Sequence, residues 1–354
     1  MAETFLRIDR LVKTFAGNTV VKGVDLSFDK GEFVTLLGPS GCGKTTILRM
    51  IAGFEYPDSG RILVEGKDVT DIPPNKRQIG MVFQAYALFP NMNVADNIGF
   101  GLKVAGRPRA EREARTEEML KLIGLSGYGK RFPFELSGGQ QQRIALARAL
   151  APSPSMLLLD EPLSALDAKI RVSLREQIRE IQRELGITTV FVTHDQEEAL
   201  SISDRIVVLN AGNVEQFGQP FDIYNRPQTR FVATFVGTLN TLEATVVDPA
   251  AQTVDIEGRT FGIPALPPTT TAGQAISLTM RPEAVSLDTE GRDIQLEGRV
   301  AEVSFLGSVI RLKVDLGRNI VSLDTFNDQR TPPPVHGATV TVAIASSDVL
   351  VLGS

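Results

Sequence analysis

Apolar and polar positions follow two different patterns along the chain. From Phe5 to about Val236, short apolar runs alternate with segments of helical spacing, which predicts a buried, mainly parallel sheet covered by helices. Arg109–Leu122 and Gly138–Leu150 are the predicted helices. The predicted buried strands are Phe33–Leu37, Ile79–Phe83, Met156–Leu159, Thr189–Val192 and Ile206–Leu209.

One segment before these runs has the two-residue period of a half-exposed strand. In Val20–Phe28 the apolar residues Val24, Leu26 and Phe28 share one side. This pattern predicts an antiparallel β edge added to the α/β domain.

After Gly237 the helical spacing disappears, and Thr, Val, Pro and Gly punctuate short strand-like runs. These runs include Val300–Phe305, Val309–Val314 and Thr339–Ile344, and proline-rich breaks at Pro264–Pro268 and Pro332–Pro334 predict loops. We therefore expect an α/β domain over residues 1–236, with a helical subdomain at about 85–150, and an all-β domain over 237–354.

Composition narrows the function classes. The 354 residues exceed what one core usually organises, and the net charge of −5, with its acidic excess after residue 239, gives no general attraction to nucleic acid. A single cysteine and the lack of a secretory signal or a long apolar stretch predict a cytosolic protein. Any membrane role would then come from a partner.

A phosphate-binding loop follows the first buried run and precedes a helical segment. In Gly38–Thr45, glycines would turn backbone N–H groups toward phosphate oxygens, Lys44 would add a cation, and Thr45 would offer a hydroxyl to Mg²⁺. The alternative is a glycine-rich turn that only ends a strand. The candidate nucleotide-binding residues here are Gly38, Ser40, Gly41, Cys42, Gly43, Lys44, Thr45 and Thr46, and the Cys42 thiol itself is assigned no chemistry.

Polar residues also end three other predicted strands. Asp160 would hold Mg²⁺, and Glu161 would align and deprotonate an attacking water, although Glu161 alone could be a surface or capping acid. His194 would reach a γ-phosphate or that water, although a lone histidine is usually structural. Gln84 would ligate Mg²⁺ or water as a sensor of nucleotide state.

A second anion cradle precedes the helix that ends at Leu150. Its residues are Ser137, Gly138, Gly139 and Gln140. Two cradles but one lysine loop suggest a twofold dimer in which each nucleotide contacts both copies. A simple N-capped helix in a monomer is the alternative.

This set of motifs resembles the ATP-binding subunit of an ABC transporter. Residues 38–45 match its Walker A loop, Gln84 its Q-loop, residues 136–140 its LSGGQ signature, residues 156–161 its Walker B motif, residues 164–167 its D-loop, and His194 its switch histidine. The resemblance implies an ATPase that binds ATP and Mg²⁺ at a head-to-tail homodimer interface. It also gives Phe15 the role of stacking on adenine, which is usually held by tyrosine.

The all-β tail resembles the oligonucleotide-binding-like regulatory domain of importers of the maltose, polyamine and ferric-iron type. Phe221–Pro227, Phe231–Gly237 and Arg281–Glu283 carry this likeness. It implies a peripheral subunit on the cytoplasmic face of the membrane, two membrane-spanning permease subunits and, indirectly, an extracytoplasmic solute-binding protein. The implied cargo is a polyamine, ferric iron or a phosphonate-type solute.

Ala85–Pro90 would be the docking segment for the permeases, or Tyr86, Leu88 and Phe89 would simply pack the core. Two other functions compete with the importer. A soluble ATPase of the same superfamily would act on nucleic acid or the ribosome, and a regulatory binder would sense a small ligand through its tail.

Overall fold

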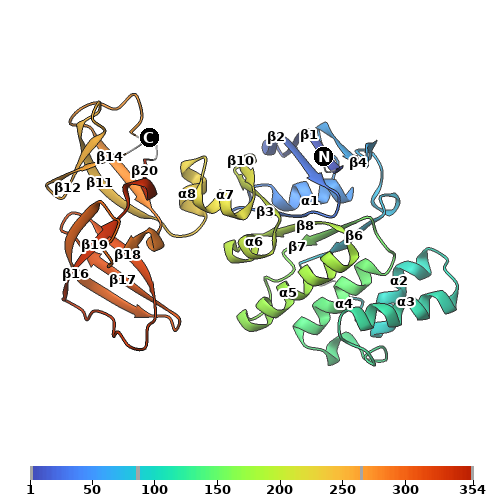
Figure 1. Cartoon of the computed structure of the whole chain (residues 1–354). Coiled ribbons are helices and arrows are strands. Elements are labelled where there is room, and N and C mark those ends of the chain that lie inside the picture. Colours follow the sequence, from blue (N-terminus) through green and yellow to red (C-terminus); the bar gives the residue numbers. More distant parts are fainter. Residues whose placement is uncertain (1–2, 85–87, 264–265, 352–354) are drawn as a thin grey trace. The chain divides into compact units, whose positions relative to one another are not determined.

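The computed structural model describes residues 3–84, 88–263 and 266–351. It divides into two compact units, Met1–Val232 and Ala233–Ser354, which are drawn in Figure 1. Ala85–Ala87 of the predicted docking segment, and residues 264–265 of a predicted loop, lie outside the described residues.

The first unit is built on a six-stranded sheet with the order β10-β9-β3-β8-β7-β6. All five predicted apolar runs form its parallel strands, and β10 pairs antiparallel with β9 at one edge. The strands are β3 (Phe33–Leu37), β6 (Ile79–Val82), β7 (Met156–Asp160), β8 (Thr188–Thr193), β9 (Arg205–Asn210) and β10 (Asn213–Gly218).

An antiparallel sheet with the order β2-β1-β4-β5 accompanies the parallel one. Its strands are β1 (Thr4–Phe15), β2 (Asn18–Asp29), β4 (Ser59–Val64) and β5 (Lys67–Asp68). Val24, Leu26 and Phe28 are buried while their neighbours in β2 face outward, as their period predicted. The predicted antiparallel β edge is confirmed.

The helices include both predicted ones with the expected bounds, α3 and α4. The described helices are α1 (Lys44–Ala52), α2 (Val94–Val104), α3 (Arg109–Leu122), α4 (Gly138–Leu150), α5 (Ala168–Leu185), α6 (Gln196–Ile202), α7 (Pro220–Asn225) and α8 (Arg230–Phe235). Within the described part of the chain, no helix combines the length and the apolar character needed to cross a bilayer.

Alternate residues of the parallel strands enter different cores. Leu157 and Leu159 of β7 pack with the helical layer that includes α2–α5, whereas Met156 and Leu158 pack with α1 and the antiparallel sheet. This two-sided burial explains why the strands are uninterrupted apolar runs. Because β6, β7 and β8 are neighbours that pair in parallel, their carboxyl ends lie side by side at one end of the sheet.

After the end of α8, the second unit is an all-β domain whose two five-stranded sheets share one core. Their orders are β13-β12-β11-β14-β20 and β15-β19-β16-β17-β18. The strands are β11 (Asn240–Asp248), β12 (Thr253–Ile256), β13 (Arg259–Gly262), β14 (Ala275–Met280), β15 (Val285–Ser286), β16 (Ile294–Phe305), β17 (Val309–Asp315), β18 (Ile320–Phe326), β19 (Thr339–Ile344) and β20 (Leu350–Val351).

Two asparagine side chains join these sheets. The buried Asn240 amide donates to the Ser322 carbonyl at 2.6 Å and accepts from the Ser322 N–H at 2.7 Å. Asn319 likewise accepts from the Glu243 N–H at 2.7 Å and donates to its carbonyl at 3.3 Å. Each side-chain amide bonds to backbone groups that have no strand partner at this point. These bonds connect β11 and β18, so the two sheets form the nearly closed barrel expected of an oligonucleotide-binding-like domain.

Candidate nucleotide-binding site

The phosphate loop, residues 38–45, links β3 to α1 and is shaped by its glycines. Gly41 and Gly43 adopt φ angles of 82° and 103°, which residues with side chains rarely adopt. A Cβ atom at Gly38 would lie 2.3 Å from the Leu209 carbonyl oxygen, and one at Gly43 would lie 2.6 Å from that of Val20. The loop therefore passes too close to its neighbours to accept a larger residue at these two positions.

The other predicted residues of the loop differ in their exposure. Ser40 is exposed and Thr46 is half-buried in the first turn of α1. Cys42 is 2% exposed, and burial raises the pKa of its thiol. A buried thiol with a raised pKa is a poor nucleophile, which agrees with a space-filling role.

Lys44 is folded back over the loop it follows. Its ammonium donates to the Gly38 carbonyl at 2.7 Å and to the Pro39 carbonyl at 2.9 Å. The residue is only 5% exposed, so these two neutral carbonyl oxygens, and not water, solvate its ammonium group. This position at the start of α1 is where a phosphate bound by the loop would find a cation.

Thr45 and Asp160 are brought together from α1 and β7. The Thr45 hydroxyl donates to Asp160 Oδ1 at 3.0 Å. Asp160 is 6% exposed, and burial raises the pKa of its carboxyl even though the hydrogen bond from Thr45 acts in the opposite direction. A buried carboxylate beside a hydroxyl offers the hard oxygen ligands that Mg²⁺ prefers.

The backbone of Glu161 turns sharply as the chain leaves β7. Its φ angle of 44° lies in the left-handed region, which is costly for a residue other than glycine. The Glu161 N–H donates to the Val192 carbonyl at 3.0 Å, and the Ser164 hydroxyl donates to the Glu161 carbonyl at 3.0 Å. Backbone strain that is held in place in this way is concentrated at functional sites.

The side chain of Glu161 meets the polar residues that end the two neighbouring strands. Gln84 Nε2 donates to Glu161 Oε2 at 3.1 Å, and His194 Nδ1 lies 3.4 Å from the same oxygen. The structure thus gathers three of the predicted catalytic residues. Among the described residues Gln84 has no hydrogen bond to Thr45 or Asp160, so its role as a metal ligand stays a prediction.

The second predicted cradle forms the N-terminus of α4. Ser137 Oγ accepts from the Gln140 N–H at 3.4 Å, and Gln140 Oε1 accepts from the Ser137 N–H at 3.0 Å. Gly138 begins the helix, and a Cβ at Gly139 would lie 2.8 Å from Ile170 Cγ2 of α5. No hydrogen bond between described residues joins this cradle to the phosphate loop. The anion-binding role of each cradle stays a prediction.

Phe15 ends β1 and is 41% exposed. The Lys13 ammonium lies 5.0 Å from the ring centroid. An exposed ring can stack on a nucleobase, and that role for Phe15 remains a prediction.

Two arginines with structural contacts were missed by the sequence analysis. Arg77 is 5% exposed and donates to two carbonyls in the last turn of α1. Arg171, on α5, bonds to Leu166 and to Asp195. In the sequence, both arginines look like ordinary surface residues, because no spacing rule identifies an arginine whose partners are distant in sequence.

Two family models match parts of this chain. A family model described as ABC transporter matches residues 21–164, and one described as TOBE domain matches residues 278–352. The spermidine/putrescine import ATP-binding protein PotA of Pseudomonas aeruginosa (strain UCBPP-PA14) is 47% identical over 338 residues, which cover 94% of this chain and 93% of that protein. The chain belongs to the ABC transporter family.

Two further relatives of this ABC protein extend the comparison. The Fe(3+) ions import ATP-binding protein FbpC of Photorhabdus laumondii is 44% identical over 313 residues, or 88% of each chain. A dimeric structure of a post-hydrolysis state of the ATP-binding cassette MJ0796, bound to ADP and Pi, matches with a TM-score of 0.55 and 33% identity, and covers 61% of this chain and 98% of that one.

These likenesses confirm the predicted family, fold class and enzymatic activity. The protein is the ATPase subunit of an ABC importer, with an ATP-binding cassette followed by a TOBE domain. A soluble ATPase acting on nucleic acid is not supported, because relatives that match nearly the whole chain are import proteins.

Proposed function

We propose that two copies of this ABC subunit close around Mg-ATP, and that closure and hydrolysis drive solute uptake through separate membrane-spanning subunits. The observation that carries the proposal is the meeting of Glu161, Gln84 and His194 at the ends of three adjacent strands. The Thr45–Asp160 pair lies at the end of the same β7 strand.

Glu161 is the group placed to accept a proton from an attacking water. The Gln84 amide donates to its Oε2, which holds the carboxylate in a defined orientation. The His194 side chain is 55% exposed beside it and is free to reach a γ-phosphate. A positioned general base contributes about 10²- to 10⁴-fold to a rate.

Magnesium fits the oxygen pair formed by the Thr45 hydroxyl and the Asp160 carboxylate. Burial raises the pKa of Asp160, and a cation bound beside it would favour the ionised carboxylate. When bound, the ion would neutralise charge on the β- and γ-phosphate oxygens. Gln84 is the proposed third protein ligand.

The dimer follows from the two cradles of the chain. The phosphate loop precedes α1 and the Ser137–Gln140 turn begins α4, and we assign one anion to each helix N-terminus. A twofold arrangement lets each nucleotide bind the loop of one copy and the turn of the other. The relative MJ0796, solved as a dimer with ADP and Pi, supports this proposal.

The variant Glu161→Gln tests this function. We expect ATP to stay bound, turnover to fall about 100-fold or more, and closed dimers to accumulate in light scattering when Mg-ATP is added. Glu180→Gln, a change at an exposed site on α5, is the matched control and should hydrolyse ATP normally. If Glu161→Gln saturated with Mg-ATP stays a single subunit, the sandwich dimer is wrong.

The permease-docking surface is proposed at residues 88–90 and α2. Phe89 is exposed, its ring centroid lies 4.6 Å from that of Phe100, and the Asn97 side chain bonds to its backbone N–H at 2.9 Å and carbonyl at 3.1 Å. Leu88 is half-buried against the helical core, so the packing alternative holds for it in part.

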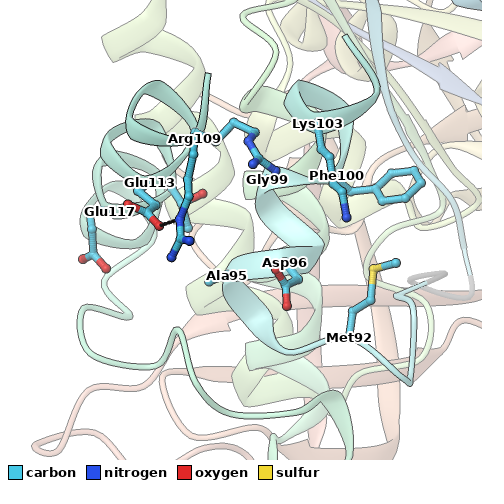
Figure 2. Close-up of a pocket in the computed structure, with 11 residues that line it drawn as sticks. Met92, Ala95, Asp96, Gly99, Phe100, Lys103, Arg109, Glu113 and Glu117 are labelled. Carbon is cyan, nitrogen blue, oxygen red and sulfur yellow. Dashed lines mark hydrogen bonds and ion pairs between the residues drawn. The ribbon is translucent and has the colours of Figure 1, made fainter. Parts of the chain in front are cut away.

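A pocket of about 710 Å³ lies next to this surface, between α2 and α3. Figure 2 shows Met92 and Phe100 on the α2 side and the ion-paired Arg109 and Glu113 on α3. Apolar side chains with charges around them are typical of a protein-docking surface. The pocket therefore supports a protein partner at this face.

The proposed cargo is a polyamine. Support comes from the relatives named for spermidine and putrescine import, and the ferric-iron relative makes Fe(3+) the second candidate. Uptake of labelled putrescine and of labelled Fe(3+) in cells with and without the gene would separate them. Gene-dependent uptake of iron but not of putrescine would contradict the polyamine assignment.

A further inference from the structure

Arg171 lies where two turns beside the catalytic strands meet. Its Nη2 donates to the Leu166 carbonyl at 3.1 Å, and its Nη1 donates to Asp195 Oδ2 at 3.2 Å. Leu166 belongs to the turn that follows Glu161, and Asp195 directly follows His194. One guanidinium group therefore links the segments that carry the proposed base and the proposed phosphate sensor.

The surroundings of Arg171 make its charge hard to replace. Arg171 Nε lies 3.7 Å from Glu198 Oε1, and Glu198 is only 3% exposed. The Thr193 hydroxyl donates to the other Glu198 oxygen at 2.5 Å and accepts from the Asp195 N–H at 3.0 Å. Two neighbouring carboxylates thus share one cation, and without it they would repel each other at a partly buried site.

The sheet itself does not fix these two turns. Pairing between β7 and β8 ends at Asp160 and Val192, and the Glu161 N–H makes the next bond, to the Val192 carbonyl. Beyond that bond the two chains no longer pair with each other, although Thr193 still pairs with Leu37 of β3. Arg171 then supplies a cross-link between the two departing segments, at the N-terminal ends of α5 and α6.

We propose that Arg171 is a positioning residue for ATP hydrolysis, which holds the turn after Glu161 against the segment that begins at His194. The proposal rests on the proposed function, because that function assigns Glu161 and His194 to the hydrolytic step. Among the described residues, no contact of Arg171 reaches the phosphate loop. Hydrolysis and ATP binding should therefore respond differently to its loss.

The first variant is Arg171→Gln, measured as steady-state ATPase activity and equilibrium ATP binding of the full chain. We expect kcat to fall about 10- to 100-fold, the effect of a misplacement of about 1 Å, while ATP affinity changes less than about threefold. Arg171→Lys keeps the positive charge but lacks the planar guanidinium that bonds to Leu166 and Asp195 at once. It should therefore have a kcat between those of Arg171→Gln and the wild type. Arg175→Gln, one turn further along α5, is the control and should keep wild-type kcat.

The second variant is Asp195→Asn, which does not alter α5. Asp195 Oδ1 accepts from the Glu198 N–H at 3.1 Å, so an amide oxygen preserves this helix cap, whereas the Oδ2 partner of Arg171 is lost. We expect a fall in kcat similar to that of Arg171→Gln. The double variant should be no slower than the slower single variant, because both remove the same link.

The results separate the two proposals. Normal kcat in both Arg171→Gln and Asp195→Asn, or losses that multiply in the double variant, would overturn the role of Arg171 while Glu161→Gln still blocks turnover. A parallel loss of ATP affinity and kcat would also overturn it, since that pattern indicates general structural damage. If Glu161→Gln retains full turnover, the proposed function itself fails.

Discussion

Lys44 and Asp160 of the proposed phosphate site are nearly fully buried, and their side chains bond to neutral groups. Attraction to Arg49 and Lys44 only partly offsets the effect of burial on the pKa of Asp160. Lys44 donates to two backbone carbonyls, and Asp160 accepts from one hydroxyl. Burying a charge is costly unless an opposite charge meets it. Both residues therefore gain when a ligand supplies that charge, a phosphate for Lys44 and a cation for Asp160.

Replacing Lys44 should weaken ATP binding and not only turnover. A hydrogen bond to a charged group is worth about 1.5–3 kcal/mol, so Lys44→Ala should raise the Kd for ATP about 10- to 100-fold. Titration of the purified subunit with a fluorescent ATP analogue measures this directly. Lys22→Ala, at an exposed position of β2, is the control, and an unchanged Kd in Lys44→Ala would remove the lysine from the site.

Asp160 gives a stability prediction that depends on pH. Because burial raises its pKa, the folded chain holds the proton more tightly than the unfolded chain. The resulting stabilisation is complete below the ordinary carboxyl pKa, about pH 4, and is lost as the pH rises through the raised value. Asp160→Asn should therefore unfold at a higher temperature than the wild type at neutral pH without Mg-ATP, and should lose Mg-dependent turnover.

Thermal unfolding from pH 4 to pH 8 checks this prediction. The difference between Asp160→Asn and wild type should shrink toward the acid end, where both side chains are neutral. Asp71→Asn, at an exposed position, should show no such trend. A wild-type chain more stable than Asp160→Asn at neutral pH would contradict the assignment of an unfavourable buried charge.

At this scale the sequence predicts the residues with local signals. Lys44, Asp160 and Glu161 follow apolar strands or a glycine loop, and their positions can be read from the chain. Arg171 cannot be found in this way, because its partners Leu166 and Asp195 come together only through the packing of α5 and α6.

The β3–α1 connection is the element on which the phosphate site depends. This connection can pass close to its neighbours because glycines stand at the points of closest approach. At Gly38, for example, a Cβ would lie 2.3 Å from the Leu209 carbonyl oxygen. The loop is therefore held between β3 and β9, whose pairing includes Leu37 and Val208.

Gly38→Ala should be costly for this reason. Forcing an extra methyl group into packed surroundings costs about 1–3 kcal/mol of unfolding free energy, and the shifted loop should also bind ATP less tightly. Gly129→Ala is a fair control, because its Cβ would meet only side chains at 3.5 Å and 3.7 Å. Urea unfolding measures both variants, and equal stability would show that the loop can move away from β9.

Elements buried on two sides are the ones that sequence predicts well. The five parallel strands are continuous apolar runs. The bounds of α3 and α4 were predicted from helical spacing instead, and most positions of α3 are exposed. The closure of the second unit is different, since Asn240 and Asn319 act as ladder partners across sheets. An asparagine in a strand-like run carries no sign of such a role, because only the three-dimensional arrangement supplies its partners.

At the scale of the whole molecule, the proposed hydrolytic site and the proposed docking surface involve different residues of the first unit. The phosphate site gathers residues from the ends of β3, β6, β7 and β8. The proposed docking surface instead involves residues 88–90 and α2, whose backbone is held by Asn97. Substitutions of exposed rings there should affect the communication between subunits without altering the chemistry.

Phe89→Ala, alone and together with Leu88→Ala, tests this separation. Asn97 bonds to the Phe89 backbone, so the segment should keep its course after the ring is removed. We expect isolated-subunit ATPase activity within about twofold of wild type, and transport in vesicles containing the permeases to fall about fivefold or more, as for an interface residue worth more than 1 kcal/mol. Phe221→Ala, which removes an exposed ring from α7, should transport normally. Full coupling in the double variant would place the permease contact elsewhere on the subunit.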